Sequence, residues 1–143
     1  MLIGEFASPL GEKNRVALPK KLRDELQSEL MITRGYEECL LIVDLQRWQD
    51  LVAEVNKRPL LNLSVRDTKR FLLGGAYNIT LDSQGRFVIP EGLMEYGHIQ
   101  QDVIFIGVGE WVEIWDKSRW QAKLADLSRN SADIADRLSE TNV

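Results

Sequence analysis

The feature that most constrains the fold of this chain is an internal duplication. At an offset of 71 residues, "LGEKNRVALPKKL" (Leu10–Leu22) lies on "LDSQGRFVIPEGL" (Leu81–Leu93), with the same Leu, Arg, Pro and Leu at four positions. At an offset of 72, "MITRGYEECLLIVDLQRWQ" lies on "VIFIGVGEWVEIWDKSRWQ" with eight identities. The sequence therefore predicts two copies of one unit in a molecule with pseudo-two-fold symmetry.

Each copy is predicted to contain strands and helices in the same order. The short apolar runs "RVAL" and "RFVI" are typical of strands, and each ends at a proline that can open a helix, over 19–27 and 90–97. Two hairpins follow, 30–34 with 39–43 and 103–108 with 111–115. Asp44 and Asp116 then stand where N-caps of amphipathic helices are expected.

The segments outside the two copies are predicted to be helical as well. Ser64 and Asp67 have the spacing of a capping box, and Gly74 follows as a stop, which predicts a linking helix over 59–74. We therefore divide the chain into a first repeat (1–58), the linking helix, a second repeat (75–127) and a weakly helical tail (128–143).

The small size of each copy indicates that the two copies share one core. A unit of this length leaves much of its apolar surface exposed when it folds alone. We therefore expect an α+β fold, mainly β, in which strands shared between the two intertwined copies form a small, pseudo-two-fold barrel with peripheral helices.

Composition excludes several classes of function. The 143 residues include one cysteine, Cys39, and one histidine, His98, so neither an internal disulfide nor a zinc cluster is expected. The segment "GEKNR" lacks the Gly-Lys-Ser/Thr ending of a phosphate loop, and no nucleophile has a nearby base. We expect no enzyme activity, cofactor or small-molecule substrate. No apolar run approaches the roughly 20 residues of a membrane span, and we expect a cytoplasmic protein.

Positive charge is concentrated in the first half of the chain. The net charge is −4 overall, but it is +1 over residues 1–71 and −5 over residues 72–143. Residues 12–23 contain five cations against Glu12 alone. A basic segment beside a repeated arginine is typical of a nucleic-acid contact, whereas the negative net charge argues against indiscriminate binding.

The duplicated motifs resemble those of the MraZ family, which is built from two AbrB-like (SpoVT-AbrB) swapped-hairpin units. The resemblance rests on the Asp-x-x-Gly-Arg motif at Asp82, Gly85 and Arg86, on its altered copy ending at Arg15, and on "LIVDLQRW", "EIWD" and "RFLLGGA". It implies a sequence-specific DNA-binding transcriptional regulator, associated with the nucleoid, that forms a homo-oligomeric ring. It also implies binding to short direct repeats upstream of its own operon in the division and cell-wall gene cluster.

The predicted DNA-binding residues lie in the two arginine loops and in the basic segment after the first loop. They are Arg15, Lys13, Asn14, Lys20, Lys21 and Arg86. Arginine can bond guanine or phosphate with two parallel donors, and the lysines add attraction to the phosphates of double-stranded DNA. Asp82 can pair with Arg86 across its turn, whereas the first loop has Gly11 at the matching position. We therefore expect the first copy to face DNA and the second to be closer to a structural element.

Two other interpretations of the same residues stay open. A carboxylate and an arginine around a turn can simply fix the loop, and basic residues on a short helix can simply be solvated. The arginine loops could instead contact protein, as in an antitoxin-like interaction module or an assembly scaffold. Acidic residues of the second half, Glu91 and Glu95 among them, could face the basic first half of a neighbouring subunit and close a ring.

Overall fold

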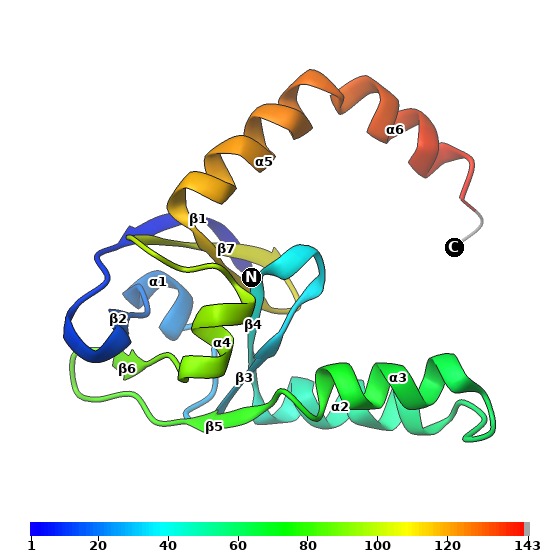
Figure 1. The fold of residues 1–143 in the computed structure, drawn as a ribbon, viewed down its shortest axis with the longest axis horizontal. Helices are drawn as coiled ribbons and strands as arrows, with labels where there is room; N and C mark the ends of the chain where they lie inside the picture. The colour runs from blue at the N-terminus through cyan, green and yellow to red at the C-terminus, as the bar shows by residue number, and fades with distance from the viewer. Residues whose placement is uncertain (142–143) are drawn as a thin grey trace.

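The computed structural model describes residues 1–141 and has an α+β fold, as predicted (Figure 1). The strands are β1 (Leu2–Ser8), β2 (Arg15–Ala17), β3 (Leu30–Arg34), β4 (Leu40–Asp44), β5 (Tyr77–Ile79), β6 (Arg86–Val88), β7 (Val103–Gly109) and β8 (Val112–Asp116). The α-helices are α1 (Lys20–Arg23), α2 (Leu45–Asn56), α3 (Leu63–Leu72), α4 (Glu91–Tyr96), α5 (Lys117–Arg129) and α6 (Ser131–Ser139), and two 3₁₀ turns are η1 (Glu12–Asn14) and η2 (Tyr36–Glu38).

The two copies exchange their first strands. The larger sheet has the order β1-β7-β8-β4-β3-β5, with every pair antiparallel. The hairpin of each copy therefore pairs with the first strand of the other copy: β1 with β7, and β5 with β3. The order is symmetric about the central β4-β8 pair, as the pseudo-two-fold relation predicts. Neither copy could complete this sheet without the other.

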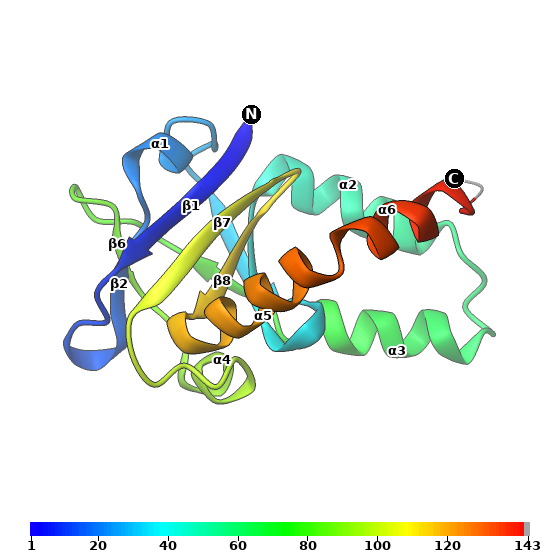
Figure 2. The same cartoon turned by 90° about the horizontal axis from the view of Figure 1, so that it is seen from above.

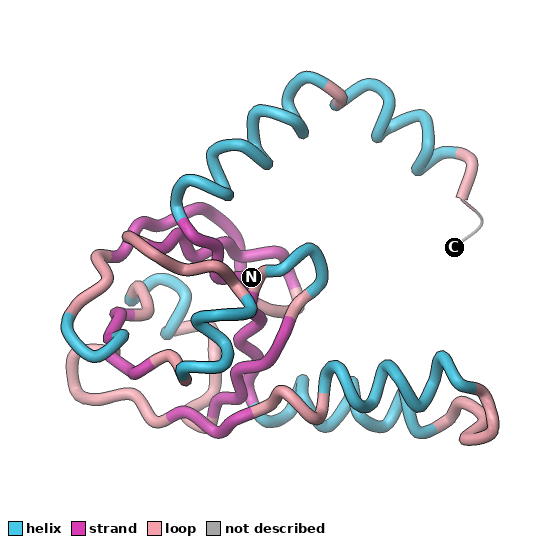
Figure 3. Tube along the Cα trace, viewed as in Figure 1, coloured by secondary structure: helices cyan, strands magenta, loops and turns pink. Residues whose placement is uncertain are grey.

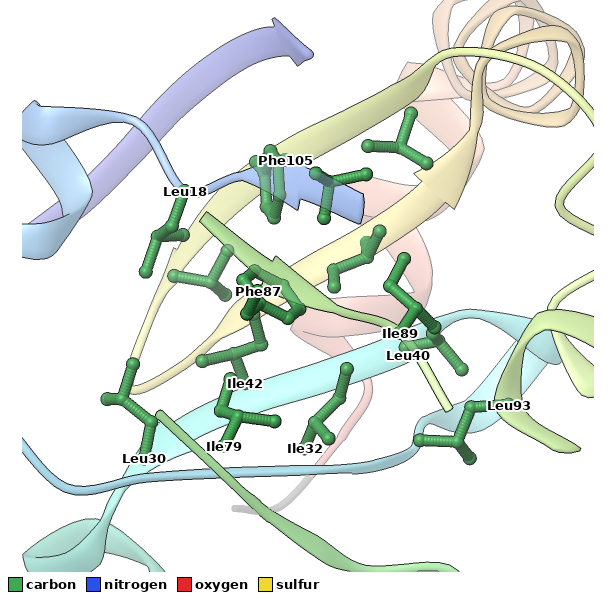
Figure 4. Packing of buried hydrophobic residues seen from close by; sticks show 14 of the residues in the cluster. Leu18, Leu30, Ile32, Leu40, Ile42, Ile79, Phe87, Ile89, Leu93 and Phe105 are labelled. Atoms are coloured by element: carbon green, nitrogen blue, oxygen red, sulfur yellow. The ribbon is translucent and has the colours of Figure 1, made fainter. Parts of the chain in front are cut away.

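A second, two-stranded sheet also joins the copies. Strands β2 and β6 pair antiparallel, with Val16 opposite Phe87. Side chains of this ribbon and of the larger sheet form one core, in which Phe87 and Ile89 pack among Ile32, Ile42 and Phe105 (Figure 4). Hydrogen bonding does not close the larger sheet within residues 1–141, because β1 and β5 are its two end strands.

The helices that follow the two hairpins extend toward the same side of the molecule. Helices α2 and α3 form an antiparallel arm on one side, and α5 continues into α6 on the other (Figures 1 and 3). The β2-β6 ribbon and α1 lie at the opposite end, as the view from above also shows (Figure 2). The described part of the tail is thus helical over most of its length, and residues 142–143 lie outside the described residues.

Three details of the predicted helices are wrong. The linking helix α3 begins at Leu63 instead of residue 59, and its N-cap is Asn62, whose side chain accepts from the Ser64 amide at 2.8 Å. Ser64 therefore lies inside the first turn, and no capping box forms. Helix α1 has only four residues because Asp24 and the residues after it turn toward β3.

The predicted N-caps at Asp44 and Asp116 are confirmed. Each buried carboxylate accepts from the backbone amide three residues later, Arg47 and Arg119 respectively. Each also accepts from the segment before its own hairpin, at the amides of Gln27 and Gln100. One side chain thus fixes both the start of a helix and the entry into a hairpin.

Candidate nucleic-acid interface

The β2-β6 pair brings the two arginine loops together. The register places Arg15 opposite Val88 and Arg86 opposite Ala17, so the arginines stand diagonally at the two ends of a short ribbon. Backbone bonds run crosswise between the loops: the Leu18 amide donates to the Gly85 carbonyl, and the Ile89 amide donates to the Asn14 carbonyl, both at 2.9 Å. The loops of the two copies therefore form one structural unit.

Strand alternation turns both arginines to the solvent. Val16 and Phe87 point into the core and are 2% and 4% exposed, so their neighbours Arg15 and Arg86 project from the outer face. An open depression on this face is lined by both arginines together with the end of β1 and the start of the first loop. The structure therefore places Arg15 and Arg86 on one surface and does not separate a DNA-facing copy from a structural one.

Asp82 holds the second loop. Its Oδ1 atom accepts from the backbone amides of Gln84 and Arg86, both at 2.9 Å, and its Oδ2 atom accepts from Arg86 Nε at 2.8 Å. The Arg86 amide is the main cause that lowers the pKa of Asp82 from 3.8 to about 2, with the Arg86 side chain and the Gln84 amide adding to it. The predicted pair of Asp82 and Arg86 is present, yet the Arg86 side chain stays 46% exposed.

The first loop adopts a similar backbone conformation without an aspartate. Its ends are joined by a bond from the Gly11 amide to the Arg15 carbonyl at 2.8 Å, which matches the bond from the Asp82 amide to the Arg86 carbonyl. Lys13 and Asn14 both adopt the left-handed region, with φ of 57° and 62°, where the second loop has Gly85 with φ of 78°. Asn14 thus takes the conformation of the glycine it replaces.

Arg15 is less restrained than Arg86. Glu12, the one acidic residue of the basic segment, does not pair with Arg15, and among residues 1–141 the Arg15 guanidinium has no ion pair. Lys13 and Lys21 are exposed cations without a carboxylate partner in the described chain, whereas Lys20 pairs with Asp24 at 2.9 Å on the surface of α1. The predicted basic residues are therefore accessible around the ribbon.

Two further side chains touch the loops, and neither is among the predicted DNA-binding residues. Glu91 at the start of α4 accepts from Asn14 Nδ2 at 3.0 Å. Arg23 at the end of α1 packs against Gly85, and its buried Nε atom has no hydrogen-bond partner in the described residues. Both contacts join one copy to the other. The duplication could have suggested them only if the exchange of strands were known.

Outside the interface, the described residues hold no group of three or more His, Cys, Asp or Glu side chains that could bind a metal ion. None of the helices in residues 1–141 has both the length and the apolar character needed to cross a membrane.

Comparison with known proteins identifies the same duplication of the chain. A family model described as "MraZ protein, putative antitoxin-like" matches residues 1–71 and again residues 72–142. The chain is 36% identical over 143 residues to the transcriptional regulator MraZ of Clostridium tetani, covering 100% of both chains. It is 38% identical over 143 residues to the transcriptional regulator MraZ of Caldicellulosiruptor saccharolyticus, again covering 100% of both chains.

The similarity to a solved structure is weaker than the similarity to these relatives. The solution structure of PHS018 from Pyrococcus horikoshii matches 80% of this chain and 88% of that chain, with 14% identity and a TM-score of 0.33. This similarity does not establish a common fold.

Proposed function

This chain belongs to the MraZ family, and from that premise we propose that it is a transcriptional regulator that binds double-stranded DNA in a sequence-specific way. The observation that carries the proposal is the placement of Arg15 and Arg86 on the outer face of one ribbon. The relatives are named as transcriptional regulators and not as enzymes.

The arginine pair is suited to reading DNA. A two-stranded ribbon is narrow enough to enter the major groove, and a guanidinium can donate two parallel bonds to O6 and N7 of guanine. Arg86 keeps exposed donors although Nε is bonded to Asp82, and Arg15 has no carboxylate partner among residues 1–141. We assign base contacts to these two arginines and the support of the first loop to Asn14.

The exposed lysines supply the part of the affinity that does not depend on sequence. Lys13, Lys20 and Lys21 border the ribbon, and each cation that neutralises a phosphate releases counterions. The surface pair of Lys20 with Asp24 is weak enough to exchange for a phosphate contact. Positive charge at one end of the molecule lets a chain of net charge −4 approach DNA in one orientation.

We propose that several subunits act together in a ring. The α2-α3 arm and helix α6 extend away from the ribbon, so contacts between subunits through them would leave the arginine loops free (Figures 1 and 2). Exposed Leu60, Leu61 and Leu63 at the tip of the first arm support such contacts. Linked loops bind direct repeats more tightly than one subunit does, because the second binding event is intramolecular.

We also propose a barrel architecture for the two copies and a DNA target. Strand exchange and the shared core support an intertwined barrel of two AbrB-like swapped-hairpin units, with repeats at 1–58 and 75–127. The target we propose is a set of short direct repeats upstream of the protein's own operon in the division and cell-wall gene cluster. We therefore also propose that the protein associates with the nucleoid.

A binding titration on the DNA directly upstream of the gene tests the function. We expect binding in preference to a scrambled duplex of equal composition, with affinity that falls steeply between low and physiological salt because phosphate contacts are lost. Light scattering at both salt concentrations gives the size of the oligomer. Equal affinity for both duplexes would refute the proposal, and a monomer under both conditions would refute the ring.

A further inference from the structure

The contact of Arg23 with Gly85 is unusual for an exposed basic helix. An ideal Cβ atom built on Gly85 would lie 2.5 Å from Nε, 2.6 Å from Cζ and 2.7 Å from Cδ of Arg23. The flat end of the side chain thus lies directly on the backbone of the second loop. Glycine favours the φ of 78° at this position, and a side chain there would have to displace the guanidinium.

The surroundings of Arg23 show that its role is not that of an ion pair. Its Nε atom is buried and unbonded in the described residues, and the guanidinium has no carboxylate partner there. An unbonded buried donor is costly, so packing against the loop has to offset that cost. The residue at the matching position of the second copy is Met94, which is buried in the apolar core.

The first loop is held by a helix of the second copy. Glu91 in α4 of the second copy accepts from Asn14 Nδ2 at 3.0 Å, and Asn14 matches Gly85 in the duplicated sequence. The residue that matches Glu91 is Lys20, which pairs with Asp24 of its own helix. Each loop is therefore held by a helix of the other copy, but by different chemistry: a guanidinium packed on glycine in one case and a carboxylate bonded to asparagine in the other.

We propose that Arg23 and Glu91 are positioning residues that fix the two arginine loops relative to each other, so that Arg15 and Arg86 meet one DNA site in a single geometry. The inference rests on the proposed DNA binding. A base contact requires the guanidinium to face the base edge, whereas attraction to phosphates tolerates movement. Loss of either residue should therefore reduce preference for the correct sequence more than it reduces general affinity for DNA.

Arg23→Ala and Arg23→Lys test the first contact. We measure affinity for the upstream duplex and for its scrambled counterpart, together with the pKa of Asp82 by NMR. Arg23→Ala should lower the ratio of the two affinities by roughly fivefold to a hundredfold, the range for a lost base contact. It should also raise the pKa of Asp82, because the loop amides that bond this carboxylate become mobile.

The lysine variant separates packing from charge. It keeps the cation but lacks the flat group that lies on Gly85, so we expect it to resemble Arg23→Ala in both measurements. If Arg23→Lys keeps the wild-type ratio, Arg23 is a phosphate contact and the positioning role is wrong. An unchanged pKa of Asp82 in Arg23→Ala would overturn it as well.

A double variant distinguishes loss of the contact between Arg23 and Gly85 from general destabilisation of the protein. Gly85→Asn accepts the left-handed conformation, as Asn14 does, but its Cβ atom would collide with Arg23. We expect Gly85→Asn to be less stable than wild type, and Arg23→Ala combined with Gly85→Asn to regain part of the loss because space is made. Additive losses in the double variant would contradict the proposed contact.

Glu91→Gln and Glu91→Ala test the second contact with equal changes of charge. Glutamine keeps an oxygen that can accept from Asn14, whereas alanine does not. Both variants should bind all DNA more tightly, and Glu95→Ala, which removes an exposed carboxylate of the same helix, is the control for this effect. Only Glu91→Ala should lose preference for the upstream duplex. Equal ratios in Glu91→Gln and Glu91→Ala would overturn the role of Glu91.

Binding by the wild-type protein distinguishes failure of the proposed function from failure of the positioning role. If the wild-type protein does not prefer the upstream duplex, the proposed function fails. If it does and every variant keeps that preference, only the positioning role fails.

Discussion

Arg15 and Arg86 occupy matching positions in the duplicated unit but are held differently. Asp82 bonds both the backbone and the side chain of Arg86, whereas Arg15 has neither an aspartate nor any other ion pair among residues 1–141. The pair of Asp82 with Arg86 was predictable because four residues around a turn bring the groups together. The contact of Arg23 with Gly85 was not, because it depends on two segments that only the folded chain brings together.

Titration of Asp82 tests how its loop is held. Bonds to the Arg86 and Gln84 amides and to the Arg86 guanidinium favour the ionised form and lower its pKa from 3.8 to about 2. The stabilising contribution is therefore complete above about pH 4 and is lost as the pH falls through 2. NMR should show the amide signals of Gln84 and Arg86 shifting with a midpoint near pH 2. A midpoint near 3.8 would contradict these bonds.

Cys39 provides a second test at the scale of one residue. Burial, aided by the charges of Glu113 and Glu37, raises the pKa of its thiol to about 12. Very little thiolate exists at pH 8, so native protein should react with iodoacetamide far more slowly than protein unfolded in urea. Mass spectrometry of the labelled chain measures both rates. Equal rates in the two states would show that Cys39 is accessible.

At the scale of elements, the helix after each hairpin begins in the same way in both copies, at an aspartate N-cap. Asp44 and Asp116 are the last residues of β4 and β8, and the sequence predicted them as N-caps because a cap is a local pattern. The capping box at Ser64 and the length of the helix after Pro19 were predicted wrongly. At Ser64 a second local pattern prevailed, because the Asn62 side chain caps the helix two residues earlier. The helix after Pro19 ends early because the chain turns toward β3, whose partners β4 and β5 lie elsewhere in the sequence.

Substitution of Asp116 measures the value of this arrangement. Asp116→Ala removes the acceptor of the Arg119 amide and that of the Gln100 amide, so we expect a loss of about 2 kcal/mol in the free energy of unfolding. Asp116→Asn keeps one amide oxygen and should lose about half as much. Urea denaturation measures both variants. A change below about 0.5 kcal/mol for Asp116→Ala would show that the cap contributes little.

Exchange of the first strands joins the two copies into one sheet. The duplication and the small size of each copy predicted a shared core, and the α+β class follows from the mixture of elements. The strand order could not be predicted, because β1 pairs with β7 and β5 with β3 across the length of the chain. Pairings of this kind depend on the complete set of strands and not on any local segment.

Separated copies should not fold alone. A fragment of residues 1–71 has β3 and β4 but lacks β5 and β7, the partners of β3 and β1, and the fragment 72–143 lacks the corresponding strands of the first copy. Circular dichroism should show little stable structure in either fragment, and mixing or coexpression should restore it. A cooperative unfolding transition in one isolated fragment would contradict the exchanged fold.

The central claim is that the two arginine loops form one DNA-reading surface, and fluorescence anisotropy with single substitutions tests it most directly. Arg15→Ala and Arg86→Ala should each bind the upstream duplex at least about tenfold more weakly while keeping the wild-type oligomer, in line with loss of a base contact. Lys57→Ala, which removes an exposed cation from the distant α2-α3 arm, is the control and should bind like wild type. Wild-type preference for the upstream duplex in both arginine variants would contradict the account.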